Sequence, residues 1–149
     1  MNKLKLACLL LLSGLGLSCA AFDHDGRIGY CGGNHRLRVV DLDMAPDPIA
    51  EKERVKRWFV RLRADGTGEC RTVIRIRDND GEEVGREVAY RLRPGMNEIS
   101  VEPSERYRLS RGEHCFEVVA DIDRTPRRVD AERRFCAREI GKRRWSMRS

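Results

Sequence analysis

The sequence contains six cysteines but no closely spaced pair, which removes the commonest pattern of a zinc site. Structural zinc sites in small domains use pairs such as C-x-x-C. Here Cys31, Cys70, Cys115 and Cys136 are separated by 39, 45 and 21 residues. Histidine is also scarce, with three in 149 residues. We therefore expect no metal site and no cofactor.

The residues needed for nucleophilic catalysis are equally sparse. The region predicted to form the folded domain has few serines, and none lies in the strand-turn-helix context of a nucleophile elbow. His114 precedes Cys115, but neighbouring residues on a strand point to opposite faces, so the two side chains do not meet. The segment Asp78-Asn79-Asp80-Gly81 lacks the spacing of a calcium loop and is typical of a tight turn. We expect that the protein is not an enzyme.

The sequence has no apolar run long enough to span a membrane. Its longest run, Leu6 to Leu17, has twelve residues, and a spanning helix needs about 20. Lys3 and Lys5 precede this run, and the small residues Ser18 to Ala21 follow it. This order is typical of a secretory signal peptide. Residues 1–20 are therefore predicted to be the signal, and the mature chain to be periplasmic or secreted.

The end of the signal allows two kinds of processing. Ser18-Cys19-Ala20 fits the small-x-small rule of ordinary signal peptidase, which would leave a soluble chain that begins at Ala21. Leu17-Ser18-Cys19 resembles a lipobox, in which Cys19 would be lipidated and would anchor the chain to the membrane. We favour the soluble form, and the lipoprotein stays open as the alternative.

The chain is basic, with a formal charge of +6, but its charges are interleaved in sign. Such interleaving indicates a solvated surface, and with the predicted export it argues against nucleic acid as a partner. Basic residues do gather near the C-terminus around Trp145, which would supply an apolar anchor. This candidate patch for an anionic membrane surface comprises Arg124, Arg127, Arg128, Lys142, Arg143, Arg144, Trp145 and Arg148. A simple solvated tail is the alternative.

The remaining pattern is that of short strands separated by turns. Alternation is clearest at Trp58, Val60 and Leu62, and turn sequences recur every 8 to 14 residues. The expected strands are 37–44, 55–63, 70–77, 83–92, 97–101, 115–121 and 132–140. Only 49–56 has helical composition. We predict an all-β protein, an immunoglobulin-like antiparallel β-sandwich of about seven strands over residues 37–140. Residues 21–36 would form a lead-in segment and 141–149 a basic tail.

The order of these motifs resembles the bacterial CARDB-type, adhesion-related domains. The resemblance lies in Leu37-Arg-Val-Val-Asp-Leu with Pro46-Asp-Pro48, Trp58-x-Val60-x-Leu62 with Asp65-Gly66-Thr67-Gly68, and Gly112-Glu-His-x-Phe116-x-Val118. It covers roughly residues 37 to 138. It implies an immunoglobulin-like fold. Because its motifs are turn glycines and alternation, it carries almost no information on function.

A second resemblance is to the ML lipid-recognition sandwiches. It lies in Cys31-Gly32, Pro46-x-Pro48 and Phe135-Cys136. In that family the first and last cysteines pair, which implies Cys31–Cys136 and leaves Cys70–Cys115. In an oxidising compartment four mature cysteines indicate two disulfides, and the arrangement Cys31–Cys70 with Cys115–Cys136 stays open.

These expectations together define a function class without a named partner. The favoured hypothesis is an exported, non-catalytic envelope protein that binds or supports an unknown protein or envelope component. A lipid or small-hydrophobe carrier of the ML type is the alternative, and a secreted enzyme inhibitor is a more distant one.

Overall fold

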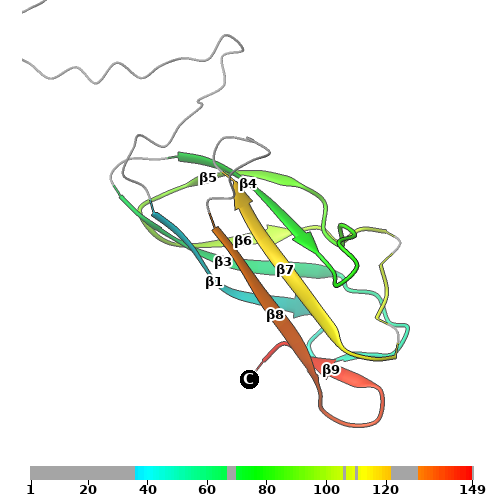
Figure 1. The fold of residues 1–149 in the computed structure, drawn as a ribbon. Coiled ribbons are helices and arrows are strands. Elements are labelled where there is room, and N and C mark those ends of the chain that lie inside the picture. Colours follow the sequence, from blue (N-terminus) through cyan, green and yellow to red (C-terminus); the bar gives the residue numbers. More distant parts are fainter. Residues whose placement is uncertain (1–35, 67–69, 106, 110, 122–130, 149) are drawn as a thin grey trace, which may run out of the picture.

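The computed structural model describes residues 36–66, 70–105, 107–109, 111–121 and 131–148, and all regular structure in them is β (Figure 1). The strands are β1 (Arg36–Ala45), β2 (Ile49–Ala50), β3 (Arg57–Asp65), β4 (Cys70–Arg77), β5 (Val88–Leu92), β6 (Gly95–Val101), β7 (His114–Asp121), β8 (Ala131–Glu139) and β9 (Arg144–Ser146). The predicted all-β fold is confirmed. The described residues include no helix long and apolar enough to cross a membrane.

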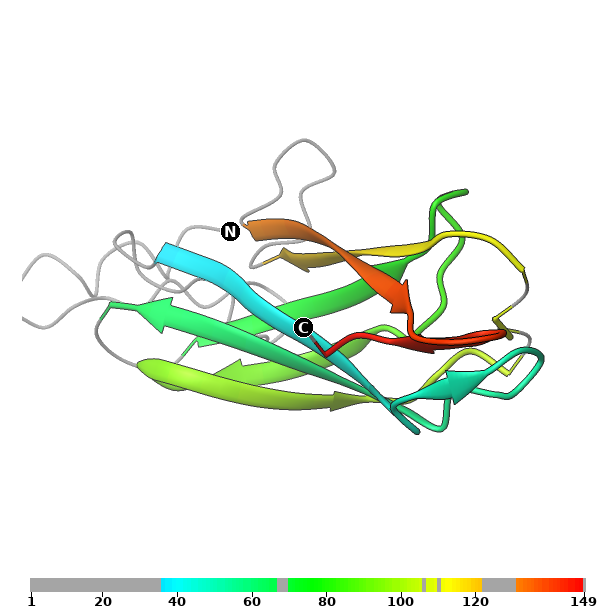
Figure 2. The same cartoon turned by 90° about the horizontal axis from the view of Figure 1, so that it is seen from below.

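Two antiparallel sheets form the sandwich. One has three strands in the order β1-β3-β6, and the other has six in the order β2-β9-β8-β7-β4-β5. Figure 2 shows the two layers, with β1, β3 and β6 on one side and β7 and β8 on the other. Because β1 runs the length of the molecule, Arg36 and Ala45 mark opposite ends of the sandwich.

Period-2 alternation places the apolar side chains between the layers. In β3, Trp58, Val60 and Leu62 are fully buried, while Arg61 and Arg63 on the other parity face solvent. Ile74 and Ile76 of β4 and Phe116 and Val118 of β7 are buried opposite them. Burying one such side chain is worth about 1.5–3 kcal/mol, so these strands contribute substantially to the stabilising free energy. The alternation predicted at Trp58, Val60 and Leu62 is confirmed.

Three aromatic rings occupy the centre of this core. The ring of Trp58 lies 4.8 Å from that of Phe116 in an edge-to-face arrangement, and Tyr107 lies 5.8 Å from Phe116. The indole N–H of Trp58 donates to the carbonyl of Val84 at 3.2 Å. This bond satisfies the polar atom of the largest buried side chain.

The two open sides of the sandwich are closed by polar contacts from the chain itself. On one side, Arg133 of β8 reaches across to β1 and donates to the carbonyl of Val40 at 2.9 Å, at a bulge in β1. On the other, the side chain of Asn97 exchanges hydrogen bonds with the backbone of Arg93 in the β5–β6 turn. Gly95 in that turn has φ +97°, a conformation that favours glycine.

The C-terminal segment differs from the tail that the sequence predicted. Arg144–Ser146 forms β9, which pairs with β8 and with β2, and Trp145 is only 3% exposed. The boundary expected at residue 141 is therefore wrong, because the sandwich continues through β9. Residues 49–56 are likewise not a helix: Ile49 and Ala50 pair with Trp145 and Arg144. Strand pairing overrides the local helical composition there.

Candidate functional site: the basic end of the sandwich

The disulfide Cys115–Cys136 is the first predicted site that the structure resolves. Cys115 and Cys136 lie directly opposite each other on β7 and β8, and their sulfurs are bonded. The preferred pairing Cys31–Cys136 with Cys70–Cys115 is therefore wrong. The physical reason is the register of the β7–β8 ladder, which places these two Cβ atoms side by side. Cys31 lies outside the described residues, as does the side chain of Cys70.

The same disulfide removes a metal-like cluster from consideration. Within the described part of the chain, Glu113, Cys115 and Cys136 offer three potential ligand atoms within 4.8 Å of one another. However, the two sulfurs are bonded to each other, so neither is the thiolate that a soft metal binds. His114 points to the opposite face, where it packs edge-on against Trp145 at 5.1 Å.

A second feature is a concentration of positive charge at the end of the sandwich where β1 finishes. Three segments distant in sequence meet there, 50–56, 107–113 and 138–144. The amide of Glu51 donates to the carbonyl of Arg143, and that of Lys52 to the carbonyl of Leu109. The three segments contain nine basic and four acidic residues, a formal excess of five, while the whole chain has an excess of six. Most of the net charge is therefore gathered at one end.

We call this surface the basic end and define it by the exposed cations Lys52, Arg111, Lys142, Arg143 and Arg144 together with Glu51 and Ile140. Its turn between β8 and β9 projects at the lower tip of the molecule in Figure 1. The amide of Ile140 donates to the carbonyl of Arg144 and closes this turn. Hydrogen-bonded backbone thus fixes where the cations are presented.

Glu51 organises two of these cations. Its side chain is 14% exposed, and its two carboxylate oxygens contact Nε of Arg111 at 3.3 Å and Nε of Arg143 at 3.2 Å. The arginine side chains are 71% and 62% exposed. Each guanidinium has four further N–H donors on its Nη atoms. One carboxylate therefore holds two guanidiniums close together at the surface.

The apolar member of the basic end is not the one that the sequence suggested. Trp145 is buried, whereas Ile140, five residues earlier, is 54% exposed in the β8–β9 turn. Among the described residues, Ile140 and Met96 are the two large hydrophobic side chains that are exposed. Ile140 is followed directly by Gly141, Lys142 and Arg143. The role proposed for Trp145 as a surface anchor is therefore wrong, because its ring belongs to the core.

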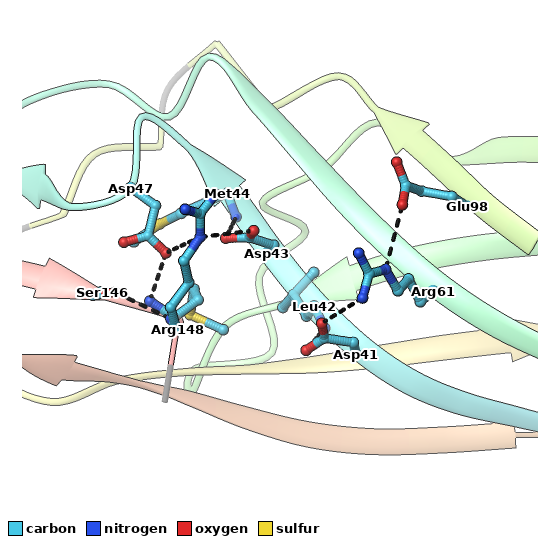
Figure 3. A network of polar contacts seen from close by, with 10 residues as sticks. Asp41, Leu42, Asp43, Met44, Asp47, Arg61, Glu98, Ser146 and Arg148 are labelled. Carbon is cyan, nitrogen blue, oxygen red and sulfur yellow. Dashed lines mark hydrogen bonds and ion pairs between the residues drawn. The ribbon is translucent and has the colours of Figure 1, made fainter.

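Arg148 also lies apart from the basic end. Its Nε lies 3.3 Å from Oδ2 of Asp43 and 3.9 Å from Oδ2 of Asp47 (Figure 3). Asp47 also accepts a hydrogen bond from the amide of Met147 at 3.1 Å, and its side chain is 1% exposed. The charge of Arg148 is thus compensated by two carboxylates at the end of β1 and in the loop that follows it.

Other charged groups on the surface are compensated in the same manner. Arg61 lies between Asp41 at 3.8 Å and Glu98 at 3.3 Å and connects the three strands of the smaller sheet (Figure 3). Arg63 donates to Asp65, and this hydrogen bond holds the pKa of that carboxyl below its ordinary value. Neither group offers unpaired charge to a ligand.

An open depression of about 340 Å³ lies beside the β6 end, lined by Glu83, Gly85, Arg86, Ser104 and Glu105. Arg86 contacts Glu105 at 2.8 Å and Glu102 at 3.5 Å. Arg86, the one cation among the lining residues, is thus already paired to carboxylates. We therefore do not assign a ligand to this depression.

The remaining predicted site residues fall outside the described part of the chain. These are Cys19, Arg124, Arg127 and Arg128. Of the predicted patch, the structure brings together Lys142, Arg143 and Arg144. It adds Glu51, Lys52, Arg111 and Ile140. The sequence did not indicate the first three because they lie 31 to 93 positions before Lys142–Arg144. The signal that was present is the turn sequence Ile140-Gly141-Lys142, in which an apolar residue precedes a glycine.

Comparison with known proteins gives only weak structural similarity. No family model and no curated protein matches the chain. Among solved structures, the β-glucuronidase of Ruminococcus gnavus in complex with uronic isofagomine is 20% identical with a TM-score of 0.31, over 68% of this chain and 15% of that one. The apo structure of the same enzyme is 18% identical with a TM-score of 0.32, again over 68% of this chain and 15% of that one. The chain spans about 15% of the length of these enzymes, and at such values we infer nothing about activity.

Proposed function

We propose that the chain is an exported, non-catalytic module of the cell envelope that binds or supports a partner through its outer surface. The disulfide between Cys115 and Cys136 is the observation that carries the proposal. Structural disulfides form and persist in oxidising compartments and are rare in the cytosol. The signal-like N-terminus, with Lys3 and Lys5 before an apolar run, is in agreement with such a compartment.

The packing of the core supports binding at the surface over binding between the sheets. Trp58, Tyr107 and Phe116 fill the space between the layers, and the indole N–H is satisfied by Val84. A carrier of the ML type needs an apolar cavity there. No observation on the described residues favours that alternative.

Fractionation of a bacterial cell that expresses the full chain tests the compartment. We expect a shortened product in the periplasmic or membrane fraction, in which Cys115 and Cys136 are disulfide-bonded. Recovery of the unprocessed chain in the cytosol with free thiols would overturn the proposal. Replacement Cys19→Ala separates the two processing routes: a lipoprotein would lose membrane association and accumulate as precursor, whereas a soluble chain would still be cut.

Sedimentation with washed envelope fragments tests the non-catalytic binding role. The processed protein should sediment with the fragments, while an inert β-sandwich of similar size should stay in solution. Uptake of a fluorescent lipid that is insensitive to salt would instead favour the carrier. Equal behaviour of the protein and the inert sandwich in both assays would exclude both roles.

A further inference from the structure

We infer that the basic end is a docking surface for an anionic lipid bilayer, with Arg111 and Arg143 directed at lipid phosphates and Ile140 inserted at the level of the headgroups. The inference rests on the proposed export and names the partner of that module. It uses the three-segment surface that the fold assembles, in place of the C-terminal tail.

The first step is the arrangement of the two arginines. The Glu51 carboxylate contacts Nε of both guanidiniums, at 3.3 Å and 3.2 Å, which limits the rotation of two otherwise flexible side chains. Arginine recognises phosphate through paired N–H donors in a planar fork. Because the pair is held before any ligand arrives, less side-chain entropy is lost on binding.

The second step is the additional positive charge around this pair. Lys52, Lys142 and Arg144 are exposed, and among the described residues they make no ion pair. Two of the acids on the same end are engaged by backbone amides: Glu53 accepts from Ala50 at 3.0 Å, and Glu139 accepts from Arg143 at 3.2 Å. Because the three segments contain nine basic and four acidic residues, the surface keeps an excess of positive charge that an anionic bilayer attracts.

The third step is the exposed apolar side chain. Ile140 is 54% exposed at the start of the β8–β9 turn and is followed at once by Lys142, Arg143 and Arg144. An aliphatic side chain beside cations is the combination that binds at a membrane interface, since the chain enters the headgroup boundary while the charges meet phosphates. Because the cations alone would also attract an acidic protein, replacement of Ile140 is part of the test.

The basic end lies at the end of the sandwich opposite the start of β1. β1 begins at Arg36 and ends at Ala45, next to the basic end. Ten residues of strand span about 33 Å at 3.3 Å each, so the start of β1 and the basic end are separated by about this length. The contact with the bilayer is therefore made by folded strands and turns far from Arg36.

Co-sedimentation of the non-acylated mature chain with vesicles tests the inference. The comparison uses vesicles of phosphatidylcholine alone and vesicles of phosphatidylcholine mixed with phosphatidylglycerol. We expect binding to the mixed vesicles only, and we expect it to fall as salt is raised from about 0.1 M to about 1 M, where the Debye length shrinks from about 10 Å to about 3 Å. Absence of binding to the mixed vesicles would overturn the inference.

A pair of matched variants assigns the binding to this end. Lys142→Gln with Arg144→Gln removes two unpaired cations and should weaken binding about 25-fold, at about fivefold for each. Arg71→Gln with Arg93→Gln removes the same charge at the opposite end and should leave binding unchanged. Equal loss in both pairs would show non-specific attraction and overturn the inference. Circular dichroism of both pairs should match that of the parent, since all four residues are exposed.

Two further arms separate the sources of binding. Ile140→Ser should weaken vesicle binding about tenfold, because the aliphatic contact is lost. If this change has no effect, or if inorganic phosphate competes fully at matched ionic strength, the surface binds a soluble or proteinaceous anion and the lipid assignment is wrong. Binding to envelope fragments without binding to vesicles would overturn this inference and leave the proposed function standing.

Discussion

Cys115 and Cys136 occupy directly opposed positions on β7 and β8, and the bond between their sulfurs links the two strands across the β7–β8 connection. Cys115 is 2% exposed, so one half of the bond is in the packed interior, while Cys136 is accessible to solvent. The bond spans 21 positions of sequence. Its main effect is therefore to restrict the unfolded chain over the segment that joins these strands.

Removal of this bond should lower the free energy of unfolding by about 3 kcal/mol, as expected for a closed loop of this length. The change is Cys115→Ala with Cys136→Ala, because alanine leaves no unsatisfied polar group at the buried position. Denaturant titration of the parent and the variant measures it. A reductant should destabilise the parent and have less effect on the variant. A peptide map in which Cys136 is bonded to another cysteine would contradict the pairing.

Arg133 is expected to stabilise the open side between β8 and β1. Its guanidinium donates to the carbonyl of Val40 at 2.9 Å and lies 5.0 Å above the ring of Phe135. Replacement Arg133→Ala should cost about 1 kcal/mol in the free energy of unfolding, because a bulged carbonyl loses its partner. Arg138→Ala on the same strand, exposed and without an ion pair among the described residues, should stay within about 0.5 kcal/mol. Equal effects of the two changes would refute the role of Arg133.

The local features of the fold could be predicted from the sequence because they depend on neighbours. Alternation in β3 identified Trp58, Val60 and Leu62 as inward-facing, since a strand has a period of two. The turn at Asp78–Gly81 was also predictable, because it depends on residues that are close in sequence. Asp78 accepts hydrogen bonds from the amides of Asp80 and Glu82. Such contacts are close in sequence and leave a readable pattern.

Features that depend on register or on distant segments could not be predicted. The partner of Cys136 follows from how β7 and β8 align, and a shift of two residues would separate it from Cys115. β9 is too short, at three residues, for its alternation to be read. The basic end combines Glu51, Arg111 and Arg143, which are brought together only by backbone pairing of three separate segments.

Asp47 is expected to hold the C-terminal residues against the end of β1. Its carboxylate accepts from the amide of Met147 and approaches Arg148, and its side chain is 1% exposed. Asp47→Ala should lower the free energy of unfolding by about 1–3 kcal/mol, because the part-buried amide of Met147 loses its acceptor. The C-terminal residues should also become susceptible to carboxypeptidase.

Glu98→Ala is the control for Asp47, because Glu98 makes an exposed ion pair with Arg61. Exposed pairs contribute about 0–1 kcal/mol, so this change should be nearly neutral and leave trimming unaltered. If the Asp47 variant is trimmed no faster than the parent, Asp47 does not hold the C-terminus.

Alkaline pH should destabilise the protein through Tyr107. Burial, and in second place the negative charge of Asp78, raise the pKa of this phenol above its ordinary value of 10.0. The folded state therefore favours the neutral phenol, while the unfolded state loses its proton near pH 10. The stability that this difference provides is complete below about pH 10 and is lost as the pH rises above it. The free energy of unfolding should fall more between about pH 9 and pH 11 for the parent than for Tyr107→Phe. An equal fall in both proteins would refute the role of Tyr107.

Trp145 and Ile140 should separate folding from binding, since the structure gives the two apolar side chains opposite environments. Trp145 is 3% exposed, lies opposite Ile49 on β2 and packs edge-on against His114. Trp145→Ala should therefore lower the free energy of unfolding by about 3–5 kcal/mol. Ile140 is 54% exposed, so Ile140→Ala should change the free energy of unfolding by no more than about 0.5 kcal/mol.

Vesicle binding measured at a temperature where both variants remain folded should show the reverse order. The Trp145 variant keeps Lys142, Arg143, Arg144 and the exposed Ile140, so its folded fraction should bind anionic vesicles like the parent. The Ile140 variant is as stable as the parent but lacks the aliphatic contact, so it should bind more weakly. Each variant serves as the control of the other. If the less stable Trp145 variant binds weakly and the stable Ile140 variant binds like the parent, Ile140 does not contact the bilayer.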